Sequence, residues 1–559
     1  MSKEAERAAA DMPLEEKIGL MLWSPFYGFR SWYEGSDARI QRRMLNKGLL
    51  GGILVKEGEL YETATMIHQI QQDIPQPVVV ASDLENGLGS LLKEGTRFPS
   101  NLAFGATRSG EYGYLSGKIT AEEAAAVGIN LIFGPTCSRT GSGLPEGLPP
   151  TRCYGERLHL VTRLSVAFVR GVHDGGSLAV PRYFPGTAVV RSGKISGSKW
   201  LHYLRKLLVD TELSVYEILS QAGLAAMMVD WREMPDLLTG KSMLVLNNRH
   251  LLEVFLREVM GFKGVVISPD LSEPDRAGLL DKTTLISALN AGVDILVGIP
   301  ESERVAKMLI DAVVQEKIPL SRVDQAAERI LAFKRRLKKT GSTAIRPEEI
   351  DQRVANSANL EVAGRIAEDS ITLLRDRANL LPLDPSEYRT LLNLSFTAKS
   401  EPDLERPLNE ALRKTFDRVI TRRIDNQDSS AVLDEAWRET GNADAIICAM
   451  FTNMPPEYSA HGFTATQIEF IQRLIKGETP VIMASFGDPL TISLFPEVDC
   501  YICLYSDCPA SQTALVKELF GKLVMPVKGK LPVTLDANFY YGSGLDHDLD
   551  LDLDLDLNS

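Results

Sequence analysis

The segment Val78–Thr107, VVVASDLENGLGSLLKEGTRFPSNLAFGAT, determines how the first half of this chain folds. It opens with a short apolar, β-branched run, which is typical of a strand buried on both faces in a parallel sheet. The run ends at Asp83, and Glu85 follows at the start of a glycine-rich loop. A carboxylate that leaves a core strand needs water, a charged partner or a ligand. Because ligands of parallel α/β folds bind at the carboxyl ends of the strands, the segment predicts a functional site beside Asp83.

Strand-like and helix-like patterns alternate in the same way through the first 340 residues. We expect seven strands there, at Leu49–Val55, Pro77–Asp83, Ile129–Pro135, Leu178–Phe184, Leu224–Trp231, Gly264–Asp270 and Val293–Ile299. With an eighth strand that the pattern does not reveal, these units favour a parallel (β/α) barrel of the TIM type. A doubly wound open sheet produces the same local pattern and stays open as the alternative.

A second alternation of strands and helices follows a polar stretch at Thr340–Pro347. Its expected strands are Leu391–Phe396, Ala445–Phe451, Pro480–Phe486 and Cys500–Tyr505, which predict a smaller, open, parallel sheet. We therefore predict four regions: a barrel domain at 1–340, a linker and connecting helix at 341–385, a second α/β domain at 386–540 and an acidic disordered tail at 541–559.

The charge and hydropathy of the chain exclude several classes of partner. Its 559 residues carry a net charge of −13, which argues against nucleic acid or an anionic membrane as the main partner. No segment reaches the roughly 18 consecutive apolar residues of a membrane span. The N-terminal residues lack the basic start and apolar core of a secretory signal, so the sequence predicts a cytoplasmic location.

The six cysteines lie mostly in apolar runs and are expected to be free core thiols. Cys500 and Cys503 have the spacing of a redox or metal pair, but a strand would turn their side chains to opposite faces. No Cys/His spacing predicts a metal site. The glycines at 141–145 do not lie between a strand and a helix, as a phosphate-binding loop would. We therefore expect no cofactor.

A series of short motifs runs in order from the barrel region into the second domain. They are DLENG (Asp83–Gly87), GTRFPS (Gly95–Ser100), RCYGE (Arg152–Glu156), RYFPG (Arg182–Gly186), GFKGVVIS (Gly261–Ser268), FGDP (Phe486–Pro489) and GKLPVT (Gly529–Thr534). In type and order they resemble the motifs of glycoside hydrolase family 3, in particular its β-N-acetylhexosaminidase branch. The resemblance implies a (β/α) barrel followed by an α/β sandwich. It also implies retaining hydrolysis of β-linked sugars, either β-N-acetylhexosaminides or β-glucosides, through a glycosyl-aspartate.

The chain departs from the family pattern at the catalytic positions. The resemblance places the nucleophilic aspartate directly after Ser268, where this chain has Pro269, and Asp270 comes one residue later. One step along a strand reverses the side-chain direction, so Asp270 is not automatically a substitute, although a bulge at Pro269 could restore its aim. The acid/base histidine and aspartate of the family correspond to Thr187 and about Gly193. Neither residue exchanges protons near neutral pH.

Acidic residues at the ends of other strands offer a way to rebuild the chemistry. Retaining hydrolysis needs two carboxyl groups about 5–5.5 Å apart, and neighbouring strands lie about 4.8 Å apart. We predict Asp270 as the nucleophile and Asp230, or alternatively Glu233, as the acid/base. The competing interpretation is that Asp270 only begins a turn into the next helix and caps it.

Five residues are predicted to bind the carbohydrate. The resemblance implies that Asp83 accepts hydrogen bonds from sugar hydroxyls, and Arg152 and Arg182 can offer forked donors to a polar ligand. Tyr183 and Trp231 are expected to stack on a sugar face. The competing interpretations are internal ion pairs for the charged residues and ordinary core packing for the two aromatic ones.

Two functions follow from these observations. The first is a hydrolase of β-linked O-glycosyl compounds, which predicts release of the chromophore from aryl β-glycosides. The second is a catalytically silent relative that binds a sugar or a partner protein at the barrel mouth, which predicts binding without turnover. The fold does not choose between them, because the same scaffold carries both kinds of protein.

Overall fold

The computed structural model divides the chain into two compact units. The barrel unit comprises Met1–Arg97, Gly110–Arg139 and Leu158–Val362, and the second unit comprises Phe98–Ser109, Thr140–Arg157 and Ala363–Ser559. The structure describes residues 9–28, 36–74, 78–140, 148–186, 211–236, 239, 241–340, 349–384, 386–397, 403–451, 462–523 and 527–545. Residues 341–348 of the predicted linker and residues 546–559 of the predicted tail lie outside the described residues.

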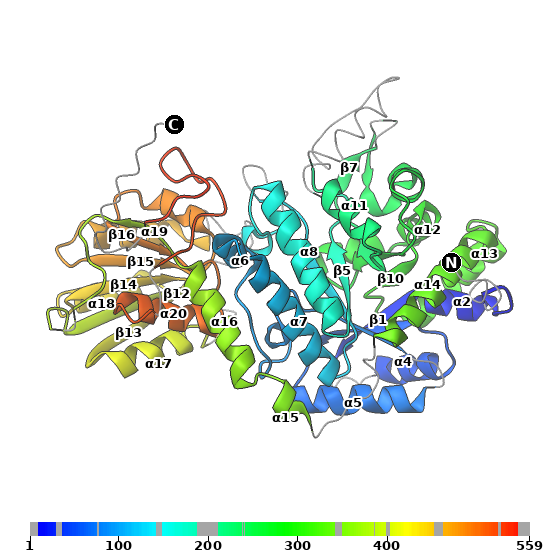
Figure 1. Cartoon of the computed structure of the whole chain (residues 1–559), viewed down its shortest axis with the longest axis horizontal. Coiled ribbons are helices and arrows are strands. Elements are labelled where there is room, and N and C mark those ends of the chain that lie inside the picture. Colours follow the sequence, from blue (N-terminus) through cyan, green and yellow to red (C-terminus); the bar gives the residue numbers. More distant parts are fainter. Residues whose placement is uncertain are drawn as a thin grey trace, which may run out of the picture. The chain divides into compact units, whose positions relative to one another are not determined.

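Eight parallel strands form the barrel (Figure 1). They are β1 (Leu22–Tyr27), β2 (Gly52–Glu57), β3 (Val79–Asp83), β4 (Leu131–Thr136), β5 (Leu178–Arg182), β6 (Ala226–Met228), β9 (Val265–Asp270) and β10 (Ile295–Val297). They follow the order β5-β4-β3-β2-β1-β10-β9-β6, and a parallel bridge between Phe184 and Val229 joins the two ends. The predicted barrel and its seven predicted strands are confirmed.

The eighth strand, which the pattern does not reveal, is β1. Its sequence, LWSPFY, contains Ser24 and Pro25 in the middle of an otherwise apolar run. Five of its six residues are nevertheless buried, because β1 lies between β2 and β10 in the sheet. The position of the strand in the closed barrel, rather than its own propensity, therefore determines its structure.

Helices surround these strands, as Figure 1 shows. They are α2 (Leu14–Leu20), α4 (Ser36–Asn46), α5 (Leu60–Asp73), α7 (Gly110–Ala126), α8 (Leu158–Asp174), α11 (Leu213–Gln221), the π-helix η4 (His250–Val259), α12 (Lys282–Ala291), α13 (Ser302–Val314), α14 (Leu320–Lys339) and α15 (Ile350–Arg353). Three short 3₁₀ helices are η1 (Leu88–Ser90), η3 (Val245–Asn247) and η5 (Pro274–Leu280). A hairpin of β7 (Glu233–Pro235) and β8 (Ser242–Leu244) follows β6.

A buried ion cluster holds the amino-terminal end of the barrel. Asp294, directly before β10, is 0% exposed and accepts hydrogen bonds from Arg257 at 2.8 Å, Arg322 at 3.0 Å and Arg329 at 3.0 Å. Burial alone would raise the pKa of Asp294, but the three arginines reverse this effect and lower it. Residues at this end of a TIM-type barrel serve stability rather than chemistry.

Replacing Asp294 with alanine should destabilise the barrel unit by about 3–5 kcal/mol, because buried arginines would lose their counter-ion. Urea unfolding measures the change. Glu303→Ala is the control, because Glu303 pairs with Arg43 where both side chains are at least half exposed. It should cost no more than about 1 kcal/mol. Equal losses in the two variants would contradict the role of the cluster.

The second unit contains an open six-stranded sheet in the order β11-β16-β15-β14-β12-β13. Its strands are β11 (Thr372–Asp376), β12 (Thr390–Thr397), β13 (Arg418–Asp425), β14 (Ala445–Met450), β15 (Val481–Ser485) and β16 (Cys500–Cys503). All pairs are parallel except that of β11 with β16. The four predicted strands are confirmed, whereas β11 and β13 are additional edge strands.

Helices cover both faces of this sheet. They are α6 (Asn101–Thr107), α16 (Ser357–Ser370, which begins in the barrel unit), α17 (Arg406–Thr415), α18 (Ser430–Thr440), α19 (Ala465–Ile475), the 3₁₀ helix η9 (Pro489–Leu494) and α20 (Pro509–Leu519). One apolar cluster contains Cys503 with residues of α18 and α19, and the other contains Cys500 with residues of α17 and α20. The predicted sandwich is therefore confirmed, as are the opposite directions of the two thiols.

All six cysteines are buried and free. Among the helices that the structure describes, none combines the length and the apolar character needed to cross a bilayer.

Glu518 of α20 should make the stability of the second unit depend on pH. Burial, and secondly the nearby Asp376 carboxylate, raise the pKa of Glu518 from 4.5 to about 7. Because the folded state binds this proton more tightly than the unfolded chain, the residue lowers stability as the pH rises from about 4.5 to about 7.

Glu518→Gln should remove this loss, which amounts to at most about 1.4 kcal/mol per pH unit in that window. Urea unfolding of the wild type and the variant at about pH 5, 6 and 7 tests the expectation. Glu410→Gln, at an exposed position on α17, is the control. If the unfolding free energies of wild type and Glu518→Gln changed with pH in parallel, Glu518 would not be the source of the pH dependence.

Candidate active site

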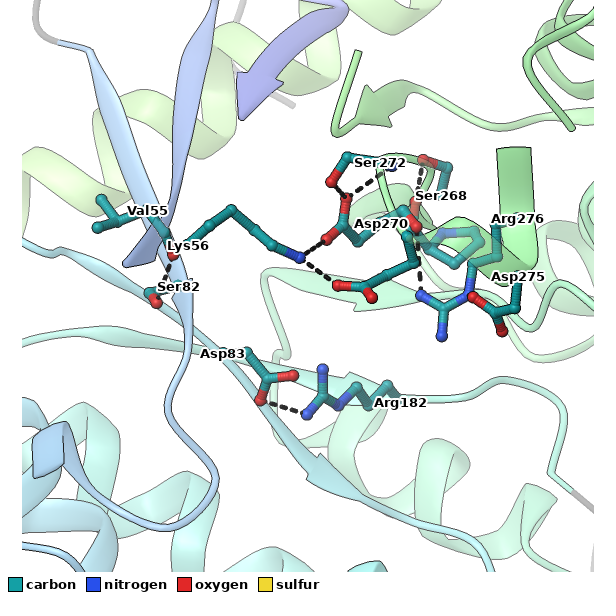
Figure 2. Close-up of polar contacts among 12 residues, drawn as sticks. Val55, Lys56, Ser82, Asp83, Arg182, Ser268, Asp270, Ser272, Asp275 and Arg276 are labelled. Atoms are coloured by element: carbon teal, nitrogen blue, oxygen red, sulfur yellow. Dashed lines mark hydrogen bonds and ion pairs between the residues drawn. The ribbon is translucent and has the colours of Figure 1, made fainter. Parts of the chain in front are cut away.

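The polar residues of interest lie at the carboxyl ends of the barrel strands, where TIM-type barrels carry their active sites. Lys56 is the last residue but one of β2, whereas Asp83 ends β3, Arg182 ends β5 and Asp270 ends β9. Figure 2 shows the Lys56 side chain extending from β2 to the Asp270 carboxylate, with the Asp83–Arg182 pair beside them. The structure therefore brings together residues from four strands at one rim.

A bulge in β9 sets the direction of Asp270. Ile267 pairs with Ile295 of β10, and Asp270 pairs with Val297, so β9 has one residue more than β10 over this interval. Ser268 Oγ accepts a hydrogen bond from the Val297 N–H at 2.9 Å and thereby satisfies a donor in the irregular segment. The irregularity lies between Ile267 and Asp270, and this interval includes Pro269, where the sequence analysis considers a bulge.

Both oxygens of the Asp270 carboxylate have partners. Oδ2 accepts a hydrogen bond from Lys56 Nζ, and Oδ1 accepts bonds from the Ser272 N–H at 3.0 Å and its hydroxyl at 2.6 Å. Strands β2 and β9 are separated by β1 and β10 in the sheet, so the ion pair of Lys56 and Asp270 reaches across the barrel mouth. The predicted turn also exists, although the first residue of η5 is Pro274 and its cap is Glu273 rather than Asp270.

Gly298 leaves room for the Asp270 carboxylate. Its φ is +73°, and a Cβ atom there would lie 2.0 Å from Asp270 Oδ1 and 2.8 Å from the backbone nitrogen of Ser272. Any side chain at this position would therefore displace the carboxylate or the turn that holds it.

Lys56 is a functional candidate that the sequence analysis does not name. Burial opposes its charge, but hydrogen bonds to Asp270 and Glu273 outweigh burial and raise the pKa of Lys56 above its usual value of 10.5. The ammonium group therefore stays protonated at neutral pH. The available signal is its place in Leu54-Val55-Lys56-Glu57, where a charged residue leaves a core strand just as Asp83 does.

Arg182 forms the second charged group of the rim. It is 2% exposed, donates to Glu85 Oε1 at 2.9 Å and pairs with Asp83 Oδ1. Glu85 also accepts a hydrogen bond from Thr136 at 2.6 Å. Burial opposes the charge of Arg182, yet the two carboxylates raise its pKa well above its ordinary value. Internal pairing thus occupies Arg182, while the Asp83 side chain stays 53% exposed.

The aromatic pair forms an edge-to-face contact beside Arg182. The ring centroids of Tyr183 and Trp231 lie 4.8 Å apart with an interplanar angle of 82°. Tyr183 is 2% exposed, so its position is that of a core residue. Trp231 is half-buried, and the Arg276 guanidinium lies 4.0 Å from the centre of its ring.

The two residues predicted as acid/base differ in exposure. Asp230 is fully buried, and its carboxylate accepts hydrogen bonds from Arg232 Nε at 2.9 and 3.1 Å. Its burial and this clamp argue against proton exchange with a substrate. Glu233 is exposed on β7 and accepts a hydrogen bond from Ser242 at 2.8 Å.

Three other positions named in the sequence analysis do not belong to the described part of the barrel unit. Arg152 belongs to the second unit, where its carbonyl accepts a hydrogen bond from Asn101 at 2.9 Å, and its role in binding stays a prediction. Thr187 and Gly193 lie outside the described residues. Within the part of the chain that the structure describes, no group of three or more His, Cys, Asp or Glu side chains is arranged to hold a metal ion.

Comparison with known proteins identifies the family. Residues 13–333 match the family model described as the glycosyl hydrolase family 3 N-terminal domain. This chain belongs to glycosyl hydrolase family 3. The matched segment covers more than half of the chain and includes Asp83, Arg182 and Asp270.

Similar proteins span nearly the whole of this family 3 chain. A β-N-acetylglucosaminidase/β-glucosidase from Cellulomonas fimi is 22% identical over 563 residues, covering 94% of this chain and 94% of its own. A solved family 3 β-N-acetylglucosaminidase from Paenibacillus sp. str. FPU-7 has a TM-score of 0.76 at 23% identity, covering 94% of this chain and 99% of its own. A solved β-glucoside phosphorylase, BglX, has a TM-score of 0.78 at 20% identity, covering 96% and 97%. These structures share the barrel and sandwich fold.

Gly298→Ala should destabilise this family 3 chain more than Gly261→Ala does. The two glycines have similar φ values, +73° and +70°, but a Cβ atom at Gly261 meets nothing within 4 Å. Both variants strain the backbone, whereas only Gly298→Ala collides with the Asp270 turn, at a further cost of about 1–3 kcal/mol. Thermal unfolding of the pair measures the difference, and equal melting temperatures would contradict the proposed packing around Asp270.

Proposed function

We propose that this chain hydrolyses β-linked glycosides, β-N-acetylglucosaminides or β-glucosides, by a retaining mechanism with Asp270 as the nucleophile. The observation that carries the proposal is the bulge in β9, which directs the Asp270 carboxylate across the barrel mouth towards Lys56. Family membership and the printed activity of the Cellulomonas fimi relative support the substrate class.

The residues around Asp270 suit a sugar ligand. Asp83 has an exposed carboxylate that can accept hydrogen bonds from two sugar hydroxyls. Trp231 offers an aromatic ring that is partly accessible, and Arg182 fixes Asp83 in place. We assign Tyr183 and Asp230 to support of these groups, because both are buried. The buried free thiols support a cytoplasmic location, where thiols stay reduced.

A second candidate function is sugar binding without turnover. The observation in its favour is that Lys56 and Ser272 already occupy both oxygens of Asp270. Hydrogen bonds to both oxygens stabilise the negative charge of the carboxylate and so weaken it as a nucleophile.

A panel of aryl β-glycosides tests the proposal. Wild-type protein should release the aryl group from β-glucosides or β-N-acetylglucosaminides, and Asp270→Asn should lower kcat by about 10³-fold or more, because an amide cannot form the glycosyl ester. Asp281→Asn, which changes an exposed helix cap in the same unit, is the control and should keep wild-type activity.

Full activity of Asp270→Asn would overturn the assignment of the nucleophile. Saturable binding of the same sugars by wild type, with no release of the aryl group, would instead establish the silent alternative.

A further inference from the structure

Glu273 shares a cation with Asp270. Lys56 Nζ donates hydrogen bonds both to Asp270 Oδ2 and to Glu273 Oε1. Two oxygens that bind the same nitrogen lie no more than about 6 Å apart, twice the length of a hydrogen bond. The carboxyl groups of Asp270 and Glu273 are therefore close neighbours, as the two carboxyl groups of a retaining glycosidase, roughly 5–5.5 Å apart, also are.

Exposure separates Glu273 from Glu85 and Asp230. The Glu273 side chain is 39% exposed, whereas those of Glu85 and Asp230 are 4% and 0% exposed. Glu85 and Asp230 are also each held by an arginine, which keeps its charge at any physiological pH. A residue that gives a proton to a leaving group and then takes one from water must be accessible to the substrate and to solvent. The exposed side chain of Glu273 meets this condition.

Asp83, which ends β3, also has an exposed side chain. Its partner is the buried Arg182, which Glu85 fixes from the other side. The partner of Glu273 is instead a lysine on a flexible four-carbon stem. Glu273 can therefore exchange its contact during a reaction more easily than Asp83 can.

We propose that Glu273 is the acid/base of the retaining reaction and that Lys56 holds it beside Asp270. The inference rests on the proposed nucleophilic role of Asp270. In the first step an Asp270 oxygen bonds to the anomeric carbon, the bond from that carbon to the leaving oxygen breaks, and Glu273 gives its proton to that oxygen. In the second step Glu273 takes a proton from water, the water oxygen bonds to the anomeric carbon, and the bond to Asp270 breaks.

The charges remain balanced through both steps. Before the first step, Lys56 faces the Asp270 carboxylate and a protonated Glu273. In the glycosyl-enzyme, Asp270 is a neutral ester and Glu273 is a carboxylate. Lys56 therefore faces one negative charge at each stage, and a proton transfer inside the site leaves no uncompensated ion at the barrel mouth.

Substrates with different leaving groups test the role of Glu273. A 2,4-dinitrophenyl glycoside needs no proton to leave, whereas a phenyl glycoside does. Glu273→Gln should lower kcat/KM for phenyl β-glycosides by about 10²-fold or more and leave the value for the dinitrophenyl substrate within a few-fold of wild type. Glu301→Gln is the control, because Glu301 lies beyond β10 and pairs with Arg304 at an exposed site. It should behave as wild type on both substrates.

Azide provides a second readout that a merely structural role would not move. With Glu273→Ala and the dinitrophenyl substrate, azide needs no general base, so it should accelerate turnover and yield the β-glycosyl azide. Asp270→Asn should show no such rescue. Thermal unfolding of each variant checks that the fold is retained.

Equal losses on both leaving groups, or the absence of a glycosyl azide, would overturn the role of Glu273 and leave that of Asp270 standing. A wild type that turns over neither sugar series would overturn the proposed function itself, and this inference with it.

Discussion

One extra residue in β9 determines the arrangement of the barrel mouth. If β9 and β10 had equal numbers of residues between their paired positions, the Asp270 side chain would point to the opposite side of the strand. The bulge reverses that direction, and the hydroxyl of Ser268 replaces a hydrogen bond of the regular ladder. Gly298 completes the arrangement, because β10 passes too close to the carboxylate for any side chain. The predicted chemistry depends on this local irregularity rather than on the family's usual spacing.

The two ends of the barrel use charge in opposite ways. At the amino-terminal end one buried aspartate, Asp294, holds three arginines, and removal of any partner leaves a buried charge without compensation. At the carboxyl end single cations hold pairs of carboxyl groups. Lys56 binds Asp270 and Glu273, and these groups are partly exposed. The first arrangement fixes the structure, whereas the second can exchange protons and contacts with a ligand.

The sequence predicts most of the barrel because its strands are apolar runs followed by helical patterns. It misses β1, where Ser24 and Pro25 interrupt the run, and in the second unit it misses the edge strand β13, where the exposed Arg418 and Arg422 break the apolar pattern. Asp83 and Asp270 are found because a carboxylate after a core strand is a strong signal. A search for any charged residue at the end of a core strand, cations as well as carboxylates, would also find Lys56. Glu273 lies in a turn, where the sequence has no periodic pattern to mark it. The burial of Asp230 could not be predicted, because its clamp by Arg232 depends on how the chain turns after β6.

Covalent trapping identifies the nucleophile by the residue that carries the sugar. The protein is incubated with an activated fluorinated β-glycoside that forms the glycosyl-enzyme faster than water releases it, and the digested chain is analysed by mass spectrometry. The bulged strand predicts a single sugar attached to the carboxylate of Asp270. A sugar attached to a different residue, or steady hydrolysis of the parent substrate with no covalent species, would contradict the account.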